Sequence, residues 1–191
     1  IGVSGTHGKT TVSSMLTQVM LMNDKDPTAV IGGRLPLINA NGCAGESENM
    51  VCEACEFVDT FLHLSPDQAV LLNIDNDHLD YFKTMENLVN SFKKFISMAN
   101  TVYVNGDDAL CLEAADGINA NIITFGLDES NDFYAKNITP GNMGMCFDAY
   151  NSKGLLGSIE LLVPGKHNVY NALAVIAVSI NEGIDFAGIK S

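Results

Sequence analysis

The hydrophobic positions near the start of the chain switch between short continuous runs and helical spacing. Residues 1–4 form an apolar run that predicts a buried strand, and the apolar residues after it recur at helical spacing. That spacing predicts a helix of about three turns that ends near residues 23–27. Residues 28–31 predict a short strand, which the glycines at 32 and 33 should stop, and the polar stretch 34–49 predicts a loop or hairpin over the strand ends.

The middle of the chain alternates predicted strands with predicted helices. Residues 50–54 predict a strand, and the continuous apolar run 68–74 is typical of a parallel strand that is buried on both faces. A helical stripe over 85–96, a strand over 101–105 and a third helix over 107–115 follow. Strands that alternate with helices predict right-handed crossovers and a parallel sheet covered by helices on both sides.

From residue 121 onward the pattern changes to short strands joined by Gly, Asn, Asp and Ser. Four such strands are predicted, at 122–125, 133–138, 145–150 and 158–163. They indicate a small antiparallel annex of hairpins. Pro164 and Gly165 close this annex, and the mostly apolar residues over 168–181 predict a return to helix.

Composition limits the classes of partner. The 191 residues suit one large domain or one domain with a small annex, and 47% hydrophobic with 17% charged residues is typical of a globular protein. The formal charge of −13 with only ten Lys and Arg residues argues against a nucleic-acid-binding or anionic-membrane surface. No apolar stretch approaches the ~18 residues of a membrane span, so we expect no membrane insertion.

The cysteines indicate a reducing compartment. Five cysteines form no regular framework, and an odd number favours free thiols and a cytoplasmic location. Cys52 and Cys55 have C-x-x-C spacing, but a zinc site would need a second pair. Two small residues that fill a strand are the better interpretation.

The first chemical motif is the glycine-rich loop between the first predicted strand and helix. Its residues are Gly5, Thr6, His7, Gly8, Lys9, Thr10 and Thr11. The glycines allow backbone N–H groups to point inward, Lys9 supplies a charge for β/γ-phosphates, and the Thr10 hydroxyl suits Mg²⁺. The general nucleotide-loop pattern requires a glycine where Val3 stands, so a glycine turn that caps an ordinary helix is the alternative. With this loop, the predicted fold class is α/β, a mostly parallel, helix-covered sheet of the P-loop NTPase type with a small antiparallel β annex.

Polar residues follow two further predicted strands. Glu53 ends one strand, and the run from Asn73 to His78 follows another. Because ligands of open α/β sheets lie at the carboxyl ends of the strands, these residues should reach the same edge as the loop. A carboxylate, an imidazole and the Thr10 hydroxyl are candidate Mg²⁺ ligands. Imidazole is an unusual ligand for Mg²⁺, so a hydrogen-bonding role for His78 remains an alternative.

Four motifs together resemble the central ATPase domain of the Mur ligases. They are Gly5-Thr6-His7-Gly8-Lys9-Thr10-Thr11, Glu53-Ala54-Cys55-Glu56, Asn73-Ile74-Asp75-Asn76-Asp77-His78-Leu79-Asp80 and Pro164-Gly165-Lys166-His167-Asn168-Val169-Tyr170-Asn171-Ala172. The resemblance covers essentially the whole chain, in the order and spacing of the family. The family loop normally lacks the glycine that is missing at Val3. His7 makes the chain most similar to the members that add L-alanine to UDP-N-acetylmuramate.

The resemblance implies an ATP-dependent ligase of peptidoglycan precursor synthesis. In that reaction ATP phosphorylates the lactyl carboxylate of UDP-N-acetylmuramate, and the amine of L-alanine displaces phosphate from the acyl phosphate. Lys9 would hold the β/γ-phosphates and Thr10 the Mg²⁺ that accompanies ATP. Glu53 and His78 would hold a second Mg²⁺ that bridges the γ-phosphate and the acceptor carboxylate.

The same resemblance implies the remaining site residues. His167, Asn168 and Asn171 would line the adenine pocket, while a helix cap with Asn168 at its start is a compatible alternative. Asn73 and His7 would face the γ-phosphate and the acceptor.

Two departures from the family pattern concern the metal site. Many members carry Asp where Cys55 stands, and several sister ligases use a carbamylated lysine. The candidates here, Lys83, Lys93 and Lys94, fit a solvated helix face better.

The domain organisation follows from the resemblance. Residues 1–191 would be the Mur ligase central ATPase domain, cut from a longer protein. The N-terminal domain that grips the UDP group and the C-terminal domain that brings the amino acid are absent from this chain. We therefore expect little or no ligase turnover from the isolated chain.

Other function classes remain open. Within the enzymes, the muramyl peptide recycling ligase and folylpolyglutamate synthase are neighbours that differ in the missing domains. A non-ligase P-loop nucleotide-binding module is a further alternative. A GTPase is disfavoured, because the chain has no Asn-Lys-x-Asp run. A regulatory module without Mg²⁺-dependent nucleotide binding is the last alternative.

Overall fold

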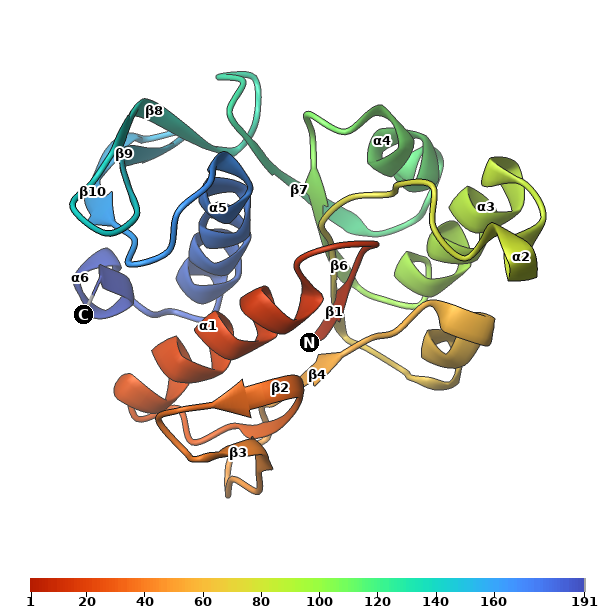
Figure 1. Cartoon of the computed structure of the whole chain (residues 1–191), viewed down its shortest axis with the longest axis horizontal. Coiled ribbons are helices and arrows are strands. Elements are labelled where there is room, and N and C mark those ends of the chain that lie inside the picture. The colour runs from red at the N-terminus through yellow and green to blue at the C-terminus, as the bar shows by residue number, and fades with distance from the viewer. Residues whose placement is uncertain (191) are drawn as a thin grey trace.

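The computed structural model describes residues 1–190, which form a single sheet of ten strands with helices on both sides (Figure 1). Ser191, the last residue of the predicted domain 1–191, and the side chain of Leu79 lie outside the described residues. The strand order across the sheet is β10-β9-β8-β7-β6-β5-β1-β4-β2-β3.

The strands are β1 (Gly2–Ser4), β2 (Thr28–Leu35), β3 (Ala40–Cys43), β4 (Met50–Glu53), β5 (Gln68–Leu71), β6 (Thr101–Asn105), β7 (Asn121–Gly126), β8 (Phe133–Pro140), β9 (Met145–Asn151) and β10 (Gly154–Glu160). The helices are α1 (Lys9–Met22), α2 (Leu79–Phe82), α3 (Met85–Ile96), α4 (Ala109–Ala115), α5 (Lys166–Asn181) and α6 (Phe186–Lys190), with a 3₁₀ segment over Phe57–His63.

The centre of the sheet is parallel, as the sequence predicts. β1 pairs in parallel with β4 and β5, β5 pairs with β6, and β2 pairs with β4. The antiparallel pairs lie at the two edges, β2 with β3 on one side and β8-β9-β10 on the other. The α/β class with a small antiparallel part is therefore confirmed.

The assignment of the predicted strand at residues 122–125 to the antiparallel annex is wrong. β7 pairs in parallel with β6 along its length, from Thr101 opposite Asn121 to Asn105 opposite Phe125, and so belongs to the main sheet. β8 also runs parallel to β7 before the hairpins begin. The physical reason is that α4 provides a crossover between β6 and β7, which allows the two strands to pair in parallel. The local sequence pattern was misleading because polar residues link the short strands after residue 126.

Two strand boundaries also differ from the prediction. β2 runs through Gly32 and Gly33 to Leu35, because the β2-β3 hairpin continues the extended chain past its parallel pairing with β4. β10 covers Gly154–Glu160 instead of 158–163. A tight turn after Asn151 reaches Gly154 with a φ of +119°, so the return strand begins at once.

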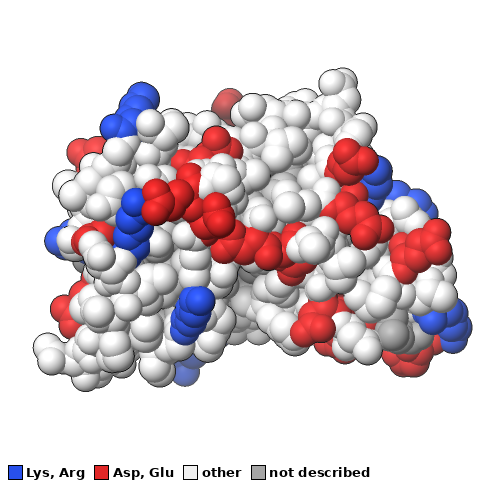
Figure 2. Space-filling view, turned by 90° about the horizontal axis from the view of Figure 1, so that it is seen from above, with Lys and Arg blue, Asp and Glu red and all other residues white. Residues whose placement is uncertain are grey.

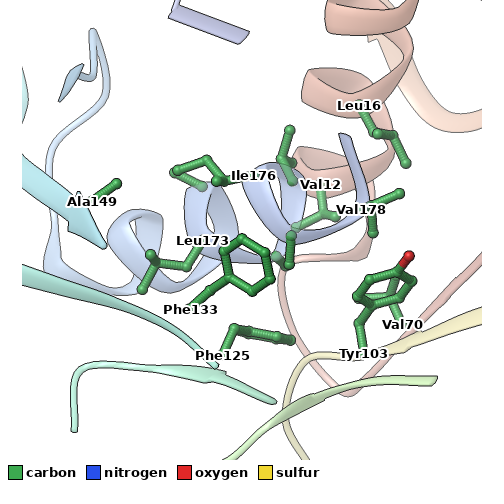
Figure 3. Close-up of a cluster of buried hydrophobic side chains, with 14 of the residues drawn as sticks. Val12, Leu16, Val70, Tyr103, Phe125, Phe133, Ala149, Leu173, Ile176 and Val178 are labelled. Atoms are coloured by element: carbon green, nitrogen blue, oxygen red, sulfur yellow. The ribbon is translucent and has the colours of Figure 1, made fainter. Parts of the chain in front are cut away.

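The strands at the centre of the sheet are buried on both faces. Val70 and Tyr103 point to the face that α1 and α5 cover, where they join a cluster with Leu16 and Leu173 (Figure 3). On the other face, side chains of β5 and β6 pack with α3 and with Phe61, whose ring stacks on Phe95 at 4.7 Å between centroids. These two clusters fix the direction in which each central strand ends, and hence the position of the loops that follow β1, β4 and β5.

The cysteines are free thiols in the structure. Cys52 lies in β4 as predicted, but Cys55 lies beyond β4 and is exposed, so the interpretation that both fill a strand is wrong for Cys55. β4 ends at Glu53 because the chain turns there into the 3₁₀ segment.

Candidate functional site

The glycine-rich loop connects the end of β1 to the start of α1 and leaves no space for side chains at its glycines. Gly5 has a φ of +136°, and a Cβ there would lie 2.9 Å from Leu72 Cβ. Gly8 has a φ of +89°, and its Cβ would lie 2.6 Å from Asn171 Oδ1 on α5. Both positions therefore require glycine, for backbone conformation and for close approach.

Asn73, just beyond β5, holds the backbone of the loop. Its Oδ1 accepts a hydrogen bond from His7 N at 2.7 Å, and its Nδ2 donates to His7 O at 2.9 Å. Thr6 N donates to Asn73 O at 3.0 Å. The Asn73 amide thus contacts the loop, while a direct role at the γ-phosphate remains a prediction. The His7 ring is largely exposed, 3.6 Å from Asp75 Oδ2.

The Lys9 ammonium is turned back into the loop. Nζ donates to Gly5 O at 2.6 Å and to Thr6 O at 3.1 Å, and it lies 2.9 Å from Glu56 Oε2. The lysine side chain is 12% exposed, and Glu56 is buried. Sequence reasoning assigned no role to Glu56. The feature of the sequence that could have pointed to Glu56 is its position three residues after Glu53, just beyond the same strand.

Thr10 and Glu53 meet directly at the start of α1. The Thr10 hydroxyl donates to Glu53 Oε2 at 2.9 Å, and the same oxygen accepts from Gly32 N at 2.8 Å. Gly32 has no side chain, and a Cβ there would overlap the Glu53 carboxylate. A hydroxyl and a carboxylate at this separation are the hard oxygen donors that Mg²⁺ prefers, so this pair fits that ion.

His78 lies beside Glu56, in the loop that connects β5 to α2. Its Nε2 is 3.8 Å from Glu56 Oε1, its Nδ1 is 3.7 Å from Asp77 Oδ1, and its ring centroid is 4.9 Å from that of Phe57. Among residues 1–190, no group of three or more His, Cys, Asp or Glu side chains is arranged to hold a metal ion. A metal shared by Glu53 and His78 therefore stays a prediction.

Two adjoining hollows lie along this edge. One, of about 360 Å³, is lined by Thr6, His7, Gly8, Lys9, Thr10, Thr11 and Glu53. The other, of about 370 Å³, is lined by His7, Gly8, Leu72, Asn73, Asn105, His167, Tyr170 and Asn171. They share His7 and Gly8, so a single ligand can reach from the phosphate loop into the second hollow. Sequence reasoning missed Leu72, Asn105 and Tyr170, although Asn105 ends a predicted strand.

Asn168 lies behind the second hollow. Its Nδ2 donates to Pro164 O at 2.7 Å, and its Oδ1 accepts from Asn171 Nδ2 at 3.1 Å. The interpretation of Asn168 as the helix cap is wrong, because α5 begins at Lys166 after the N-cap residue Gly165. Asn168 instead orients Asn171, and its contact with adenine stays a prediction.

Tyr170 joins the hollow to a hydrogen-bonded carboxylate. Its hydroxyl donates to Asp107 Oδ2 at 3.0 Å, and Asp107 also accepts from Leu127 N and Asn131 Nδ2. Partial burial, together with Asp107, raises the pKa of Tyr170 to about 12. Burial opposes ionisation of Asp107, but its hydrogen bonds outweigh burial and lower its pKa.

The charge of the surrounding surface is mainly negative. Figure 2 views the molecule from above, the direction in which β1 runs in Figure 1, and shows Asp and Glu gathered in a band across that face. An anionic ligand bound at this edge would therefore depend on Lys9, on helix N-termini and on bound cations for its charge compensation. No helix among the described residues has the length and apolar character needed to cross a membrane.

Comparisons with known sequences agree on one family. The family described as the Mur ligase middle domain matches residues 3–179. The UDP-N-acetylmuramate--L-alanine ligase of Clostridium acetobutylicum is 44% identical over 184 residues, which are 94% of this chain and 40% of that protein. The enzyme of the same name from Caldanaerobacter subterraneus is 41% identical over 189 residues, 97% of this chain and 41% of its own length. The chain thus spans about two fifths of the length of these curated relatives.

Solved structures show the same likeness. The UDP-N-acetylmuramate-alanine ligase MurC from Thermotoga maritima has a TM-score of 0.86 and 28% identity, over 100% of this chain and 43% of its own. The UDP-N-acetylmuramate:L-alanyl-gamma-D-glutamyl-meso-diaminopimelate ligase from Neisseria meningitides has a TM-score of 0.88 and 28% identity, over 100% of this chain and 63% of its own.

Proposed function

Since the chain belongs to the Mur ligase middle-domain family, we propose that residues 1–191 are the ATP-binding central domain of a ligase that adds L-alanine to UDP-N-acetylmuramate. The names of relatives at 41–44% identity support this choice of substrates. One N-terminal domain for the UDP group and one C-terminal domain for the amino acid would complete the enzyme. Both substrates are small molecules, and we propose a cytoplasmic location.

The observation that carries the proposal is the continuity of the phosphate loop with the second hollow. ATP would place its triphosphate along the loop N–H groups and Lys9, and its adenine between the loop and α5. His167 and Asn171 line that hollow, and Asn168 holds Asn171 in place. The two adjoining hollows therefore support a nucleoside triphosphate better than inorganic phosphate alone.

The proposed reaction joins a carboxylate to an amine in two steps. The terminal phosphoryl group of ATP passes to the lactyl carboxylate, which leaves ADP and an acyl phosphate. The amine of L-alanine then attacks the acyl carbon, phosphate leaves, and a proton is lost from the nitrogen. Lys9 would compensate the phosphate charge, and the fixed loop would hold the triphosphate for in-line transfer.

The oxygen pair of Thr10 and Glu53 fits a bound Mg²⁺, and we propose that both residues hold it with ATP. Mg²⁺ would supply charge neutralisation at the phosphates. His78 would contribute at a second position together with Glu53. The acidic band across the face in Figure 2 would repel a polyanion such as ATP, and a bound divalent cation would offset this repulsion.

Titration calorimetry of the chain with ATP, with GTP and with adenosine tests nucleotide binding. We expect ATP to bind in the presence of Mg²⁺ more tightly than GTP, and Lys9→Ala to weaken this binding at least about tenfold while the circular dichroism spectrum is unchanged. Equal affinity for ATP in the wild type and in Lys9→Ala would contradict the proposed site.

A second candidate is a ligase that attaches a peptide instead of a single amino acid, which the likeness to the Neisseria meningitides structure favours. The choice of amine substrate is tested in the enzyme that carries this chain with its flanking domains. ADP formation that depends on L-alanine supports the first function. ADP formation that depends on L-alanyl-γ-D-glutamyl-meso-diaminopimelate and not on L-alanine supports the second.

A further inference from the structure

Glu56 has an unusual environment for a carboxylate. It is 1% exposed, although it lies only three residues after Glu53 at the end of β4. Its Oε2 is 2.9 Å from Lys9 Nζ and has no other hydrogen-bond partner, and Nζ donates to its Oε1 at 3.2 Å. Burying an ionised carboxylate without a partner costs free energy, so the ion pair with Lys9 stabilises Glu56 in this position.

The same contacts leave Lys9 without a free donor. An ammonium group has three N–H donors, and the contacts of Nζ are Gly5 O, Thr6 O and the Glu56 carboxylate. Gly5 and Thr6 belong to the loop that would surround the phosphates, so these two bonds are compatible with a bound triphosphate. The third contact of Nζ is with Glu56, which follows β4 in the sequence and lies outside the loop.

We propose that Glu56 is a positioning residue that acts through Lys9, holding the ammonium back against the loop until a nucleotide phosphate takes its place. A triphosphate carries several negative charges, so it competes well with a single carboxylate for the ammonium. The proposal rests on the proposed nucleotide-binding function, and it assigns to Glu56 a role distinct from that of Glu53.

His78 gives the released carboxylate a second neighbour. Its Nε2 lies 3.8 Å from Glu56 Oε1, and the centroid of the Phe57 ring lies 4.9 Å from that of the imidazole. Glu56 and Phe57 are consecutive residues, so one short segment contacts both the phosphate lysine and the histidine. Glu56 thereby connects the two ends of the site.

The proposal predicts the direction of change in affinity. Glu56→Gln keeps the shape and an acceptor for Lys9 but removes the competing charge. ATP should therefore bind the variant at least threefold more tightly than the wild type in metal-free buffer. Glu56→Gln should have no effect on affinity in a Lys9→Met background. Glu113→Gln, an exposed carboxylate on α4, is the matched control and should not change the affinity.

Two results in calorimetry would overturn the proposal: unchanged or weaker ATP binding by Glu56→Gln, or the same gain in affinity when Lys9 is absent. A residue that only supported the fold would not tighten binding. If the wild type fails to bind ATP under any condition, the proposed function fails, and the nucleotide-free measurement below still tests the Glu56–Lys9 contact.

That measurement is the rate of amine labelling at Lys9, followed by mass spectrometry. Glu56→Gln should raise labelling of Lys9 several-fold relative to Lys153, which lies in the exposed turn between β9 and β10. If the single variant Glu56→Gln fails to fold, the melting temperature of Lys9→Met is compared with that of Lys9→Met combined with Glu56→Gln. This comparison tests the contact between Glu56 and Lys9. The double variant should be the more stable, because it leaves no unpaired buried charge. Unchanged labelling, or a less stable double variant, would overturn the proposal.

Discussion

The Thr10 hydroxyl donates to Glu53 Oε2 at 2.9 Å and so joins the first turn of α1 to the end of β4, across 43 residues of sequence. Thr10→Val removes this oxygen and keeps the side-chain shape. We expect the gain in ATP affinity that Mg²⁺ produces to fall at least about tenfold, equivalent to ~1.4 kcal/mol. Affinity in metal-free buffer should change little.

Calorimetry with and without Mg²⁺ measures this difference, and Thr60→Val, an exposed threonine of the 3₁₀ segment, is the control. A Mg²⁺ effect that is equal in Thr10→Val and in the wild type would remove Thr10 from the metal site. Glu53→Gln should behave as Thr10→Val does.

Gly8→Ala tests how closely α5 approaches the loop. The new methyl group would lie 2.6 Å from Asn171 Oδ1 at a φ of +89°, so the loop or α5 must shift. We expect a loss of about 1–3 kcal/mol of stability and at least tenfold weaker ATP binding. Gly117→Ala is the control, because Gly117 has a φ of +70° but no atom within 4 Å of the added Cβ.

Urea unfolding and ATP titration separate the two effects. Gly117→Ala should lose stability through backbone strain alone and keep its ATP affinity. Equal losses of affinity in both variants would show that the contact with Asn171 does not shape the site.

The sequence could predict the loop because glycine, lysine and threonine at fixed spacing have a local backbone cause. It could not predict that Glu56 is buried, because burial there depends on Lys9, which is 47 residues away. Local pattern likewise predicted strand at β7 but assigned its partner wrongly. Whether a short strand pairs in parallel depends on the crossover through α4, which is a property of the whole sheet.

Asn171→Ala tests the assignment of the adenine end. Asn171 lines the second hollow. Its side-chain amide donates a hydrogen bond to Asn168 Oδ1 and, among the hydrogen bonds of the described residues, none to Lys9 or Glu53. We expect ATP affinity to fall by about fivefold to fiftyfold, as for the loss of a hydrogen bond in a mainly apolar pocket. Inorganic triphosphate should keep its affinity, and competition titrations of both ligands measure the contrast. Parallel losses for both ligands would contradict this division of the site.

Asp107→Asn tests the carboxylate that braces Tyr170. The hydrogen bonds to Asp107 lower its pKa in the folded chain below the ordinary value of 3.8. Its stabilising effect is therefore full above the ordinary pKa and is lost as the pH falls through the lower, folded value. We expect Asp107→Asn to lose about 1 kcal/mol at pH 7, a modest figure because the side chain is exposed.

Urea unfolding at pH 7, 5, 4 and 3.5 follows that loss. The difference between Asp107→Asn and the wild type should narrow only below about pH 4. A difference that stays constant down to pH 3.5 would mean that the charge of Asp107 does not stabilise the fold.

The two helices that border the adjoining hollows come from opposite ends of the described chain. α1 begins at Lys9 and α5 at Lys166, and their side chains share one hydrophobic cluster (Figure 3). During synthesis the loop leaves the ribosome before α5, which follows more than 150 residues later and provides the proposed adenine side of the site. A nascent chain that stops before α5 contains the whole phosphate loop but lacks the α5 residues that line the second hollow. We therefore expect tight ATP binding only after α5 has been synthesised and has packed against α1.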